Sequence, residues 1–140
     1  MIITKECDYA LRIIRELADN QKKLVDSICN KEFIPRPYAY KILKKLEKAG
    51  IVKSYRGPSG GYMLSKDTGS FTLYDILIAI QDDAFLSECM KRGFQCIRDD
   101  PGQPCMVHQE LCRIQKIMIA AFSEKSLAEI INTINTNESK

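Results

Sequence analysis

Four of the six cysteines and the only histidine of this 140-residue chain lie close together in the sequence. In chain order these residues are Cys89, Cys96, Cys105, His108 and Cys112. Three thiolates and one imidazole are a donor set that suits a small metal centre, either a structural zinc ion or an iron–sulfur cluster. The same thiols could instead form a metal-free redox switch. The pattern therefore predicts a cysteine-based site.

The gaps between these cysteines decide among the alternatives only in part. Zinc fingers usually pair cysteines across two to four residues. The gaps after Cys89 and Cys96 are longer, which weakens the case for a zinc site without excluding it. A loop with incidental cysteines is disfavoured, because the histidine follows so soon after Cys105. Cys7 and Cys29 stand alone in other segments and are predicted to be core thiols. A cluster and a thiol switch both stay open.

The composition is typical of a soluble globular protein, with 45% apolar and 28% charged residues. The longest apolar run, residues 117–122, is far shorter than the roughly 20 residues that cross a bilayer. Lys5 and Glu6 follow the start almost at once, so no signal-peptide core is expected. We therefore expect a cytoplasmic protein without a membrane partner. Structural disulfides are unusual in that reducing compartment.

The net charge of +3 is unevenly distributed along the chain. Residues 31–66 hold nine Lys/Arg and two Glu, a balance of +7, whereas residues 67–102 hold three Lys/Arg and seven acidic residues, a balance of −4. A compact basic block is typical of a surface that binds nucleic acid. The acidic block, residues 67–102, is not expected to contact the phosphates of a nucleic acid bound by the basic block.

The basic block contains a predicted helix-turn-helix. One helix is expected to begin after Thr4, a second to run over about residues 26–33, and a third over residues 37–49. Pro37 suits the first turn of the third helix, and Gly50 suits the position after its end. One face of this third helix is apolar. The other carries lysines, namely Lys41, Lys44, Lys45 and Lys48.

Two short predicted strands, over residues 51–55 and 62–65, follow this helix. The tip between them contains three glycines, one proline and Arg56. Its backbone can approach a phosphate closely, and Arg56 can enter a narrow minor groove. The tip is not a nucleotide-binding loop, because it lacks the Gly-Lys-Ser/Thr ending and leads into a strand. A helix-turn-helix followed by a hairpin predicts a mainly α winged-helix fold.

The second half of the chain is predicted to be helical around an irregular segment. A threonine–aspartate capping box opens a helix over about residues 72–81, and residues 82–104 show no clear period. A long helix is expected to begin near Cys105, and a second capping box at Ser126 to open a terminal helix. The tail over residues 135–140 is expected to be frayed.

The long helix is predicted to pair with a second copy of the chain. Its apolar residues repeat close to a coiled-coil seam, and a helix-turn-helix monomer covers only half of a typical operator. Packing inside one chain is the alternative. The predicted dimerisation residues are Leu111, Ile114, Met118, Ala121 and Phe122. We expect a winged-helix DNA-binding domain over residues 1–70, with the cluster loop and dimerisation helices over residues 71–140.

The chain resembles the bacterial winged-helix regulators of the IscR and NsrR type, which carry iron–sulfur clusters. The resemblance rests on the wing between Ile51 and Lys66 with its Arg-Gly-Pro-x-Gly-Gly-Tyr motif, on the helix start at Thr72, and on the spaced cysteines followed by His108. It covers about residues 4–131. It implies a homodimer whose binding of double-stranded operator DNA is gated by an iron–sulfur cluster. It also implies that the protein is not an enzyme.

The resemblance also implies a set of metal ligands. Three thiolates are implied, from Cys89, Cys96 and Cys105. His108 matches the fourth ligand of the branch that binds [2Fe–2S], and Asp8 matches the aspartate that completes a [4Fe–4S] cluster across the dimer in the nitric-oxide branch. A [2Fe–2S] cluster with His108 is favoured. The longer cysteine gaps and the extra Cys112 depart from the family pattern, so cluster type and fourth ligand stay open.

The DNA-binding positions implied by the resemblance lie in the third helix and the wing. They are Arg36, Pro37, Tyr38, Tyr40, Lys41, Lys44, Lys45, Arg56 and Gly57. For Tyr38 the alternative is a position in the hydrophobic core. For Lys44 and Lys45 the alternative is contact with phosphate and not with bases. A small redox enzyme or electron carrier is disfavoured, because the chain lacks a Cys-x-x-Cys motif, a nucleotide-binding loop and an acid–base pair around its histidine. No small-molecule substrate is expected. The alternative function is a winged-helix regulator with a metal-free thiol redox switch.

Overall fold

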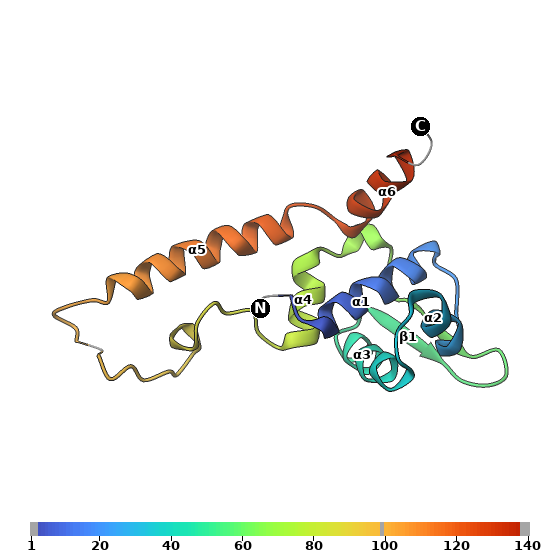
Figure 1. The fold of residues 1–140 in the computed structure, drawn as a ribbon, viewed down its shortest axis with the longest axis horizontal. Coiled ribbons are helices and arrows are strands. Elements are labelled where there is room, and N and C mark those ends of the chain that lie inside the picture. The colour runs from blue at the N-terminus through green and yellow to red at the C-terminus, as the bar shows by residue number, and fades with distance from the viewer. Residues whose placement is uncertain (1–2, 99, 138–140) are drawn as a thin grey trace.

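The computed structural model describes residues 3–98 and 100–137, the last five as backbone. Within them the helices are α1 (Lys5–Glu16), α2 (Val25–Glu32), α3 (Arg36–Lys48), α4 (Leu73–Gln81), α5 (Met106–Ser123) and α6 (Leu127–Asn137). The strands are β1 (Val52–Tyr55) and β2 (Gly61–Leu64), and the 3₁₀ turns are η1 (Leu17–Asp19), η2 (Thr68–Ser70) and η3 (Glu88–Met90). Figure 1 shows α1–α4 and the hairpin packed together, with α5 extending away from them.

The predicted helix-turn-helix is confirmed, with its ends shifted by one or two residues. The Thr4 hydroxyl caps α1 by accepting the Cys7 backbone N–H at 3.3 Å. After α2, Phe33 takes a left-handed conformation with φ of 55° and turns the chain into α3. Pro37 lies in the first turn of α3, and Gly50, with φ of 76°, follows its end.

The hairpin is antiparallel, with Val52 paired to Leu64 and Tyr55 to Gly61. Backbone hydrogen bonds of 2.8 Å run in both directions between Lys23 and Tyr62, so the segment before α2 pairs with the outer edge of β2. A Cβ atom at Gly61, where φ is +147°, would lie 2.5 Å from the Lys23 carbonyl oxygen. Glycine is therefore required where the wing meets this segment.

One hydrophobic core joins α1, α2, α3, the hairpin and α4. Its fully buried large side chains include Ile13, Ile14, Leu17, Ile28, Ile42, Leu43, Leu46, Ile76, Leu77 and Ile80. The capping box of α4 is confirmed in both directions: the Thr72 hydroxyl accepts the Asp75 backbone N–H at 3.3 Å, and the Asp75 carboxylate accepts the Thr72 backbone N–H at 2.8 Å. We call residues 3–81 the body. The predicted division of the chain after residue 70 stays a prediction.

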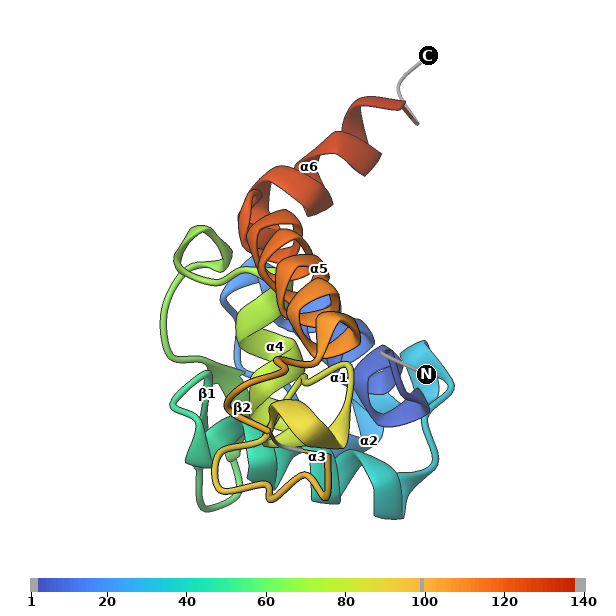
Figure 2. The ribbon, with the colours of Figure 1, turned by 90° about the vertical axis from the view of Figure 1, so that its left-hand side faces the viewer.

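The chain itself covers little of α5. Among its residues, all of which the structure describes, Gln115 alone is buried, while Ile114 and Ile117 are 40% and 55% exposed. Figure 2, a view along this helix, shows the irregular segment that precedes it lying beneath its first turns. We call residues 82–123 the cysteine region.

The α6 helix begins at the predicted capping box, in which the Ser126 backbone N–H and hydroxyl both donate to Glu129. Leu127 is buried and its N–H donates to the Phe71 carbonyl at 2.8 Å. The expectation of a frayed tail was wrong for residues 135–137, because α6 continues through Asn137. Once a helix has been started, each further residue adds one backbone hydrogen bond. Residues 138–140 lie outside the described residues. None of the described helices is both long and apolar enough to cross a membrane.

Candidate nucleic-acid interface and cysteine site

The polar face of α3 is exposed as the lysine spacing predicted. Ala39, Ile42, Leu43 and Leu46 are buried, and this fixes the opposite side of the helix toward solvent. The exposed side chains on that side are Arg36, Pro37, Tyr38, Tyr40, Lys41, Lys44, Glu47 and Lys48. Helical periodicity alone therefore positions most of the residues predicted to contact DNA.

Arg36 is held at the start of α3 by two neighbours. Its Nε lies 3.0 Å from Oδ1 of Asp26 in α2, and its guanidinium carbon lies 5.8 Å from the centre of the Tyr40 ring. Tyr38 is partly packed and partly exposed: its ring packs edge-on against buried Tyr9, with centroids 5.9 Å apart, while 46% of it is exposed. Its contact with DNA stays a prediction.

Two lysines of α3 are paired with a carboxylate of α1. Lys41 Nζ lies 2.5 Å from one oxygen of Glu6, and Lys45 Nζ lies 3.0 Å from the other. These hydrogen bonds, from Lys41 above all, hold the pKa of Glu6 below its ordinary value. Lys45 is half-buried and also donates to the Ile80 carbonyl, so the structure gives it a contact inside the body.

The wing and the start of α3 enclose a hollow of about 460 Å³. Residues that are distant in sequence meet around it, including Arg36, Tyr40, Tyr55, Arg56, Gly57 and Tyr62. Two guanidinium groups, aromatic rings and glycine backbone are the groups that proteins use to contact phosphates and groove edges. The structure thus brings the predicted helix and wing residues to one surface.

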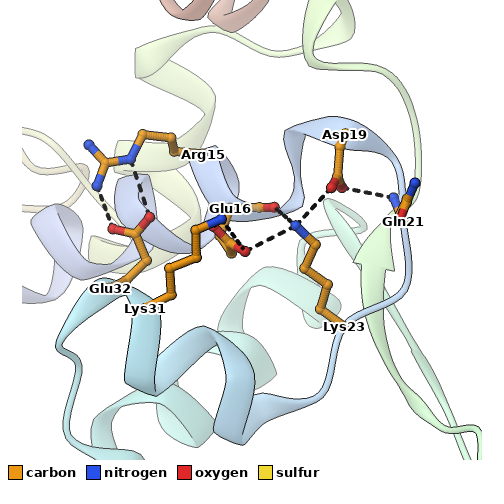
Figure 3. Close-up of polar contacts among 7 residues, drawn as sticks. All are labelled: Arg15, Glu16, Asp19, Gln21, Lys23, Lys31 and Glu32. Atoms are coloured by element: carbon orange, nitrogen blue, oxygen red, sulfur yellow. Dashed lines mark hydrogen bonds and ion pairs between the residues drawn. The ribbon is translucent and has the colours of Figure 1, made fainter.

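Sequence reasoning missed an ionic network around two buried glutamates, which holds α2 and the wing against α1 (Figure 3). Lys23 Nζ lies 3.0 Å from a carboxylate oxygen of Glu16 and 2.8 Å from Asp19, and Lys31 lies 2.9 Å from Glu16. On the same face, Arg15 pairs with buried Glu32. The spacing of Asp19 and Lys23 was the one visible signal. Because the Lys23 backbone pairs with Tyr62, the network also fixes the wing.

Burial and ion pairing act in opposite directions on this network. Burial raises the pKa of Glu16, but the hydrogen bonds from Lys31 and Lys23 outweigh it and the pKa is lowered. Burial lowers the pKa of Lys23, but Asp19 and Glu16 outweigh it and the pKa is raised. Glu16 is therefore a buried carboxylate that stays charged because two ammonium groups hold it.

The cysteine region brings three of its donors into contact. Cys89 Sγ, in η3, lies 3.4 Å from Nδ1 of His108, and Cys112 Sγ lies 3.5 Å from Nε2 of the same ring. Cys105 caps α5, its sulfur accepting the His108 backbone N–H at 3.5 Å. Cys96 lies in the exposed part of the loop. Cys112, which the sequence treated as extra, is thus closer to the imidazole than Cys96.

The donors fit an iron–sulfur cluster in their chemistry, since four thiols and an imidazole are ligands of the kinds that such clusters use. Their arrangement does not enclose an ion. The His108 ring lies between Cys89 and Cys112, and its two nitrogens point in different directions. Across the described ranges, 3–98 and 100–137, no three such side chains are grouped to hold a metal. The ligand set Cys89, Cys96, Cys105 and His108 stays a prediction.

Asp8, the alternative fourth ligand, lies on α1. Its carboxylate pairs with Arg12 one helical turn later, at 3.0 Å, and is about half exposed. This position leaves it free to face another copy of the chain, and its role also stays a prediction.

Gln115 joins α5 to the segment that leads into η3. Its side-chain amide donates to the Ala84 carbonyl at 2.9 Å and accepts the Leu86 N–H at 3.0 Å. Of the predicted dimerisation residues, Ile114 and Ala121 are exposed, and Leu111, Met118 and Phe122 are half-buried. The sequence did not predict that Gln115, a polar residue among apolar ones, would be the buried residue of α5.

The chain matches the family model Rrf2, described as an iron-dependent transcriptional regulator, over residues 3–133. It is 30% identical over 134 residues to a protein of Aquifex aeolicus assigned as an HTH-type transcriptional regulator, covering 94% of this chain and 92% of that one. It is 27% identical to the HTH-type transcriptional regulator IscR of Klebsiella pneumoniae, covering 94% of this chain and 80% of the relative.

Two solved structures share the fold. The global cysteine regulator CymR of B. subtilis has a TM-score of 0.73 at 22% identity, covering 94% of this chain and 96% of that one. The IscR of T. potens has a TM-score of 0.70 at 21% identity, covering 94% of this chain and 87% of that one. At these identities the likeness supports the winged-helix architecture and nothing finer.

Proposed function

The chain belongs to the Rrf2 family of transcriptional regulators, and from this premise we propose that it binds operator DNA as a homodimer under the control of an iron–sulfur cluster. DNA would contact α3 and the wing, and the cluster would be held in the cysteine region. The observation that carries the DNA-binding part is the hollow between Arg36 and Arg56, where helix and wing offer two cations and glycine backbone to one surface.

The homodimer is supported by the exposure of α5. A helix of 18 residues with a single buried side chain leaves apolar surface in water, which a second copy would cover. A two-fold dimer would present two recognition helices to an inverted repeat, with half-sites about one helical turn, roughly 10 bp, or a multiple apart.

The cluster is supported by the donor set and by the family description. Cys89, Cys96 and Cys105 would supply the thiolates and His108 the fourth ligand of a [2Fe–2S] cluster, which we favour over a [4Fe–4S] cluster completed by Asp8. Such a group supplies a centre whose charge and ligation respond to redox state. The chain's part is to bring its ligands together, which requires the His108 ring to leave its position between Cys89 and Cys112.

A metal-free thiol switch is the second candidate. One observation favours it, namely that the His108 ring contacts the sulfurs of both Cys89 and Cys112 and so brings two thiols to one imidazole. In that case the regulated event would be oxidation of thiols rather than loss of iron.

Anaerobic purification separates the two candidates. A cluster gives visible charge-transfer absorption with stoichiometric iron and sulfide, lost in Cys89→Ala, Cys96→Ala and Cys105→Ala but kept in the control Cys29→Ala. His108→Ala changes the spectrum if the [2Fe–2S] assignment holds, and Asp8→Ala changes it if the alternative holds. Protein without iron whose DNA binding responds to peroxide would overturn the cluster and support the switch.

A further inference from the structure

A carboxylate in the first turn of α1 lies against the proposed DNA-binding helix. The Glu6 side chain is 24% exposed, and each of its oxygens pairs with one lysine of α3, Lys41 or Lys45. Lys41 is itself 56% exposed, on the face that carries Arg36 and Tyr40. A phosphate that approaches Lys41 must therefore compete with a carboxylate already in place.

The other lysine of the pair connects Glu6 to the end of α4. Lys45 Nζ donates to the Ile80 carbonyl at 2.8 Å. Ile80 lies in the last turn of α4, where carbonyls lack a partner within the helix. The next residue, Gln81, donates to the sulfur of Cys7 at 3.0 Å. The end of α4 is thus joined to the first turn of α1 through two neighbouring residues.

Beyond Gln81 the backbone is held by α5. Gln115, which is 6% exposed, bonds the Ala84 carbonyl and the Leu86 N–H, and lies three residues after Cys112. Polar contacts therefore run from the cysteine region through the end of α4 to Lys45, Glu6 and Lys41. A movement of α5 or η3 would act on the group that competes with DNA for Lys41.

We propose that Glu6 is a positioning residue that withholds Lys41 from DNA phosphate, and that the end of α4, held by Gln115, sets how strongly it does so. This deepens the proposed function and rests on it. The physical basis is local: Lys45 shares its donors between Ile80 and Glu6, so a displaced α4 end changes how much of the carboxylate remains for Lys41.

The test is the salt dependence of binding to a short random-sequence duplex, because phosphate contacts are independent of sequence. Each added phosphate contact steepens the plot of log K against log salt by about 0.9. Glu6→Gln removes the charge and keeps an acceptor, so we expect tighter binding and a slope steeper by about one contact. The matched control is Glu47→Gln, at an exposed glutamate of α3 whose carboxylate accepts a hydrogen bond from Ser54.

Lys41→Gln makes the result independent of the fold of the Glu6 variant. In the wild-type background the slope should fall by clearly less than one contact, because Glu6 competes for Lys41, and in the Glu6→Gln background it should fall by about one contact. A one-contact loss in the wild-type background would overturn the proposal. So would equal slope changes in Glu6→Gln and Glu47→Gln, which would indicate general electrostatics.

The link to the cysteine region is tested with Gln115→Leu. It should change the slope in the wild-type background and leave it unchanged in the Glu6→Gln background, since the carboxylate is then absent. Equal changes in both backgrounds would overturn the link. Wild-type protein that binds the duplex without salt dependence would instead overturn the proposed function, and the two failures are thereby distinguished.

Discussion

The body and the cysteine region differ in how much of their surface the chain itself covers. In the body, ten large aliphatic side chains of α1–α4 and η1 are fully buried, and the buried carboxylate of Glu16 has two cationic partners. In α5, the one buried residue is Gln115, and four apolar side chains of the helix are at least 40% exposed. The body is complete as a single chain, whereas the cysteine region presents groups that a partner or ligand would cover.

This difference assigns stability to one region and responsiveness to the other. A densely packed body with its polar groups paired holds the α3 helix and the wing at a fixed angle. A region with few buried contacts opens at lower cost, as segments that respond to ligands generally do. The contacts of Lys45 and Gln115 lie at the junction between the two regions.

The largest expected effect is on α5. Replacing Ile114 and Met118 together by glutamate places two charges in the proposed dimer seam, and we expect about 4 kcal/mol or more of association free energy to be lost. Sedimentation velocity should report a monomer, and operator binding should be lost with it. The control Lys116→Glu reverses a charge on the side of the same helix opposite Ile114 and Met118. A dimer that survives the double change would contradict the assignment of the seam.

Truncating an apolar side chain should cost more stability in the body than in α5, and this can be measured in a monomer. Ile13→Ala in the body should reduce the free energy of unfolding by about 2–5 kcal/mol, because Ile13 is fully buried. Ile117→Ala, made in the monomeric Ile114/Met118 variant, should reduce it by less than about 1 kcal/mol. Urea unfolding measures both. Similar losses at the two positions would mean that α5 packs on the body more than its exposure indicates.

The ionic network predicts a smaller effect that depends on pH. Lys23→Met should cost about 1–3 kcal/mol at pH 7, because Glu16 then keeps only Lys31. Folding lowers the pKa of Glu16 from its ordinary 4.5, so its stabilising contribution exists above that value and is lost as pH falls through the folded pKa. The cost measured by urea unfolding should therefore shrink as the pH falls below 4.5 and through the folded pKa of Glu16.

Asp19→Asn is the matched control for this change. Asp19 is 46% exposed, so removing its charge should cost less than about 1 kcal/mol at pH 7. A cost for Lys23→Met that stays constant between pH 7 and pH 3 would contradict the assignment of its effect to Glu16.

The sequence predicted the elements of the body because they rest on local rules. The lysine spacing of α3, the capping box at Thr72 and the glycine-rich tip each act within a few residues, and all three were confirmed. The pairing of Lys23 with Tyr62 could not be predicted, because it joins segments that approach only in the folded chain. For the same reason the lysine face of α3 did not reveal Glu6, which lies 35 residues before Lys41.

The cysteine site was predictable in its residues but not in its geometry. The spacing of Cys105, His108 and Cys112 predicted one helix face, and the contact between His108 and Cys112 agrees with it. The partner of His108 across the loop depends on how residues 82–104 cross back to α5, for which no periodic pattern exists. The donor residues could therefore be identified from the sequence, whereas the position of the His108 ring between Cys89 and Cys112 required the folded structure.

The most direct test of the account compares DNA binding with and without the cluster. Operators selected from a random duplex pool would be titrated anaerobically with the iron-loaded protein and with the same protein after iron removal, with Cys89→Ala as a cluster-free reference. We predict that the two forms differ in affinity or in the operators they select, and that iron-free protein matches Cys89→Ala. Equal affinity of both forms for every selected operator would contradict control of DNA binding by the cysteine region.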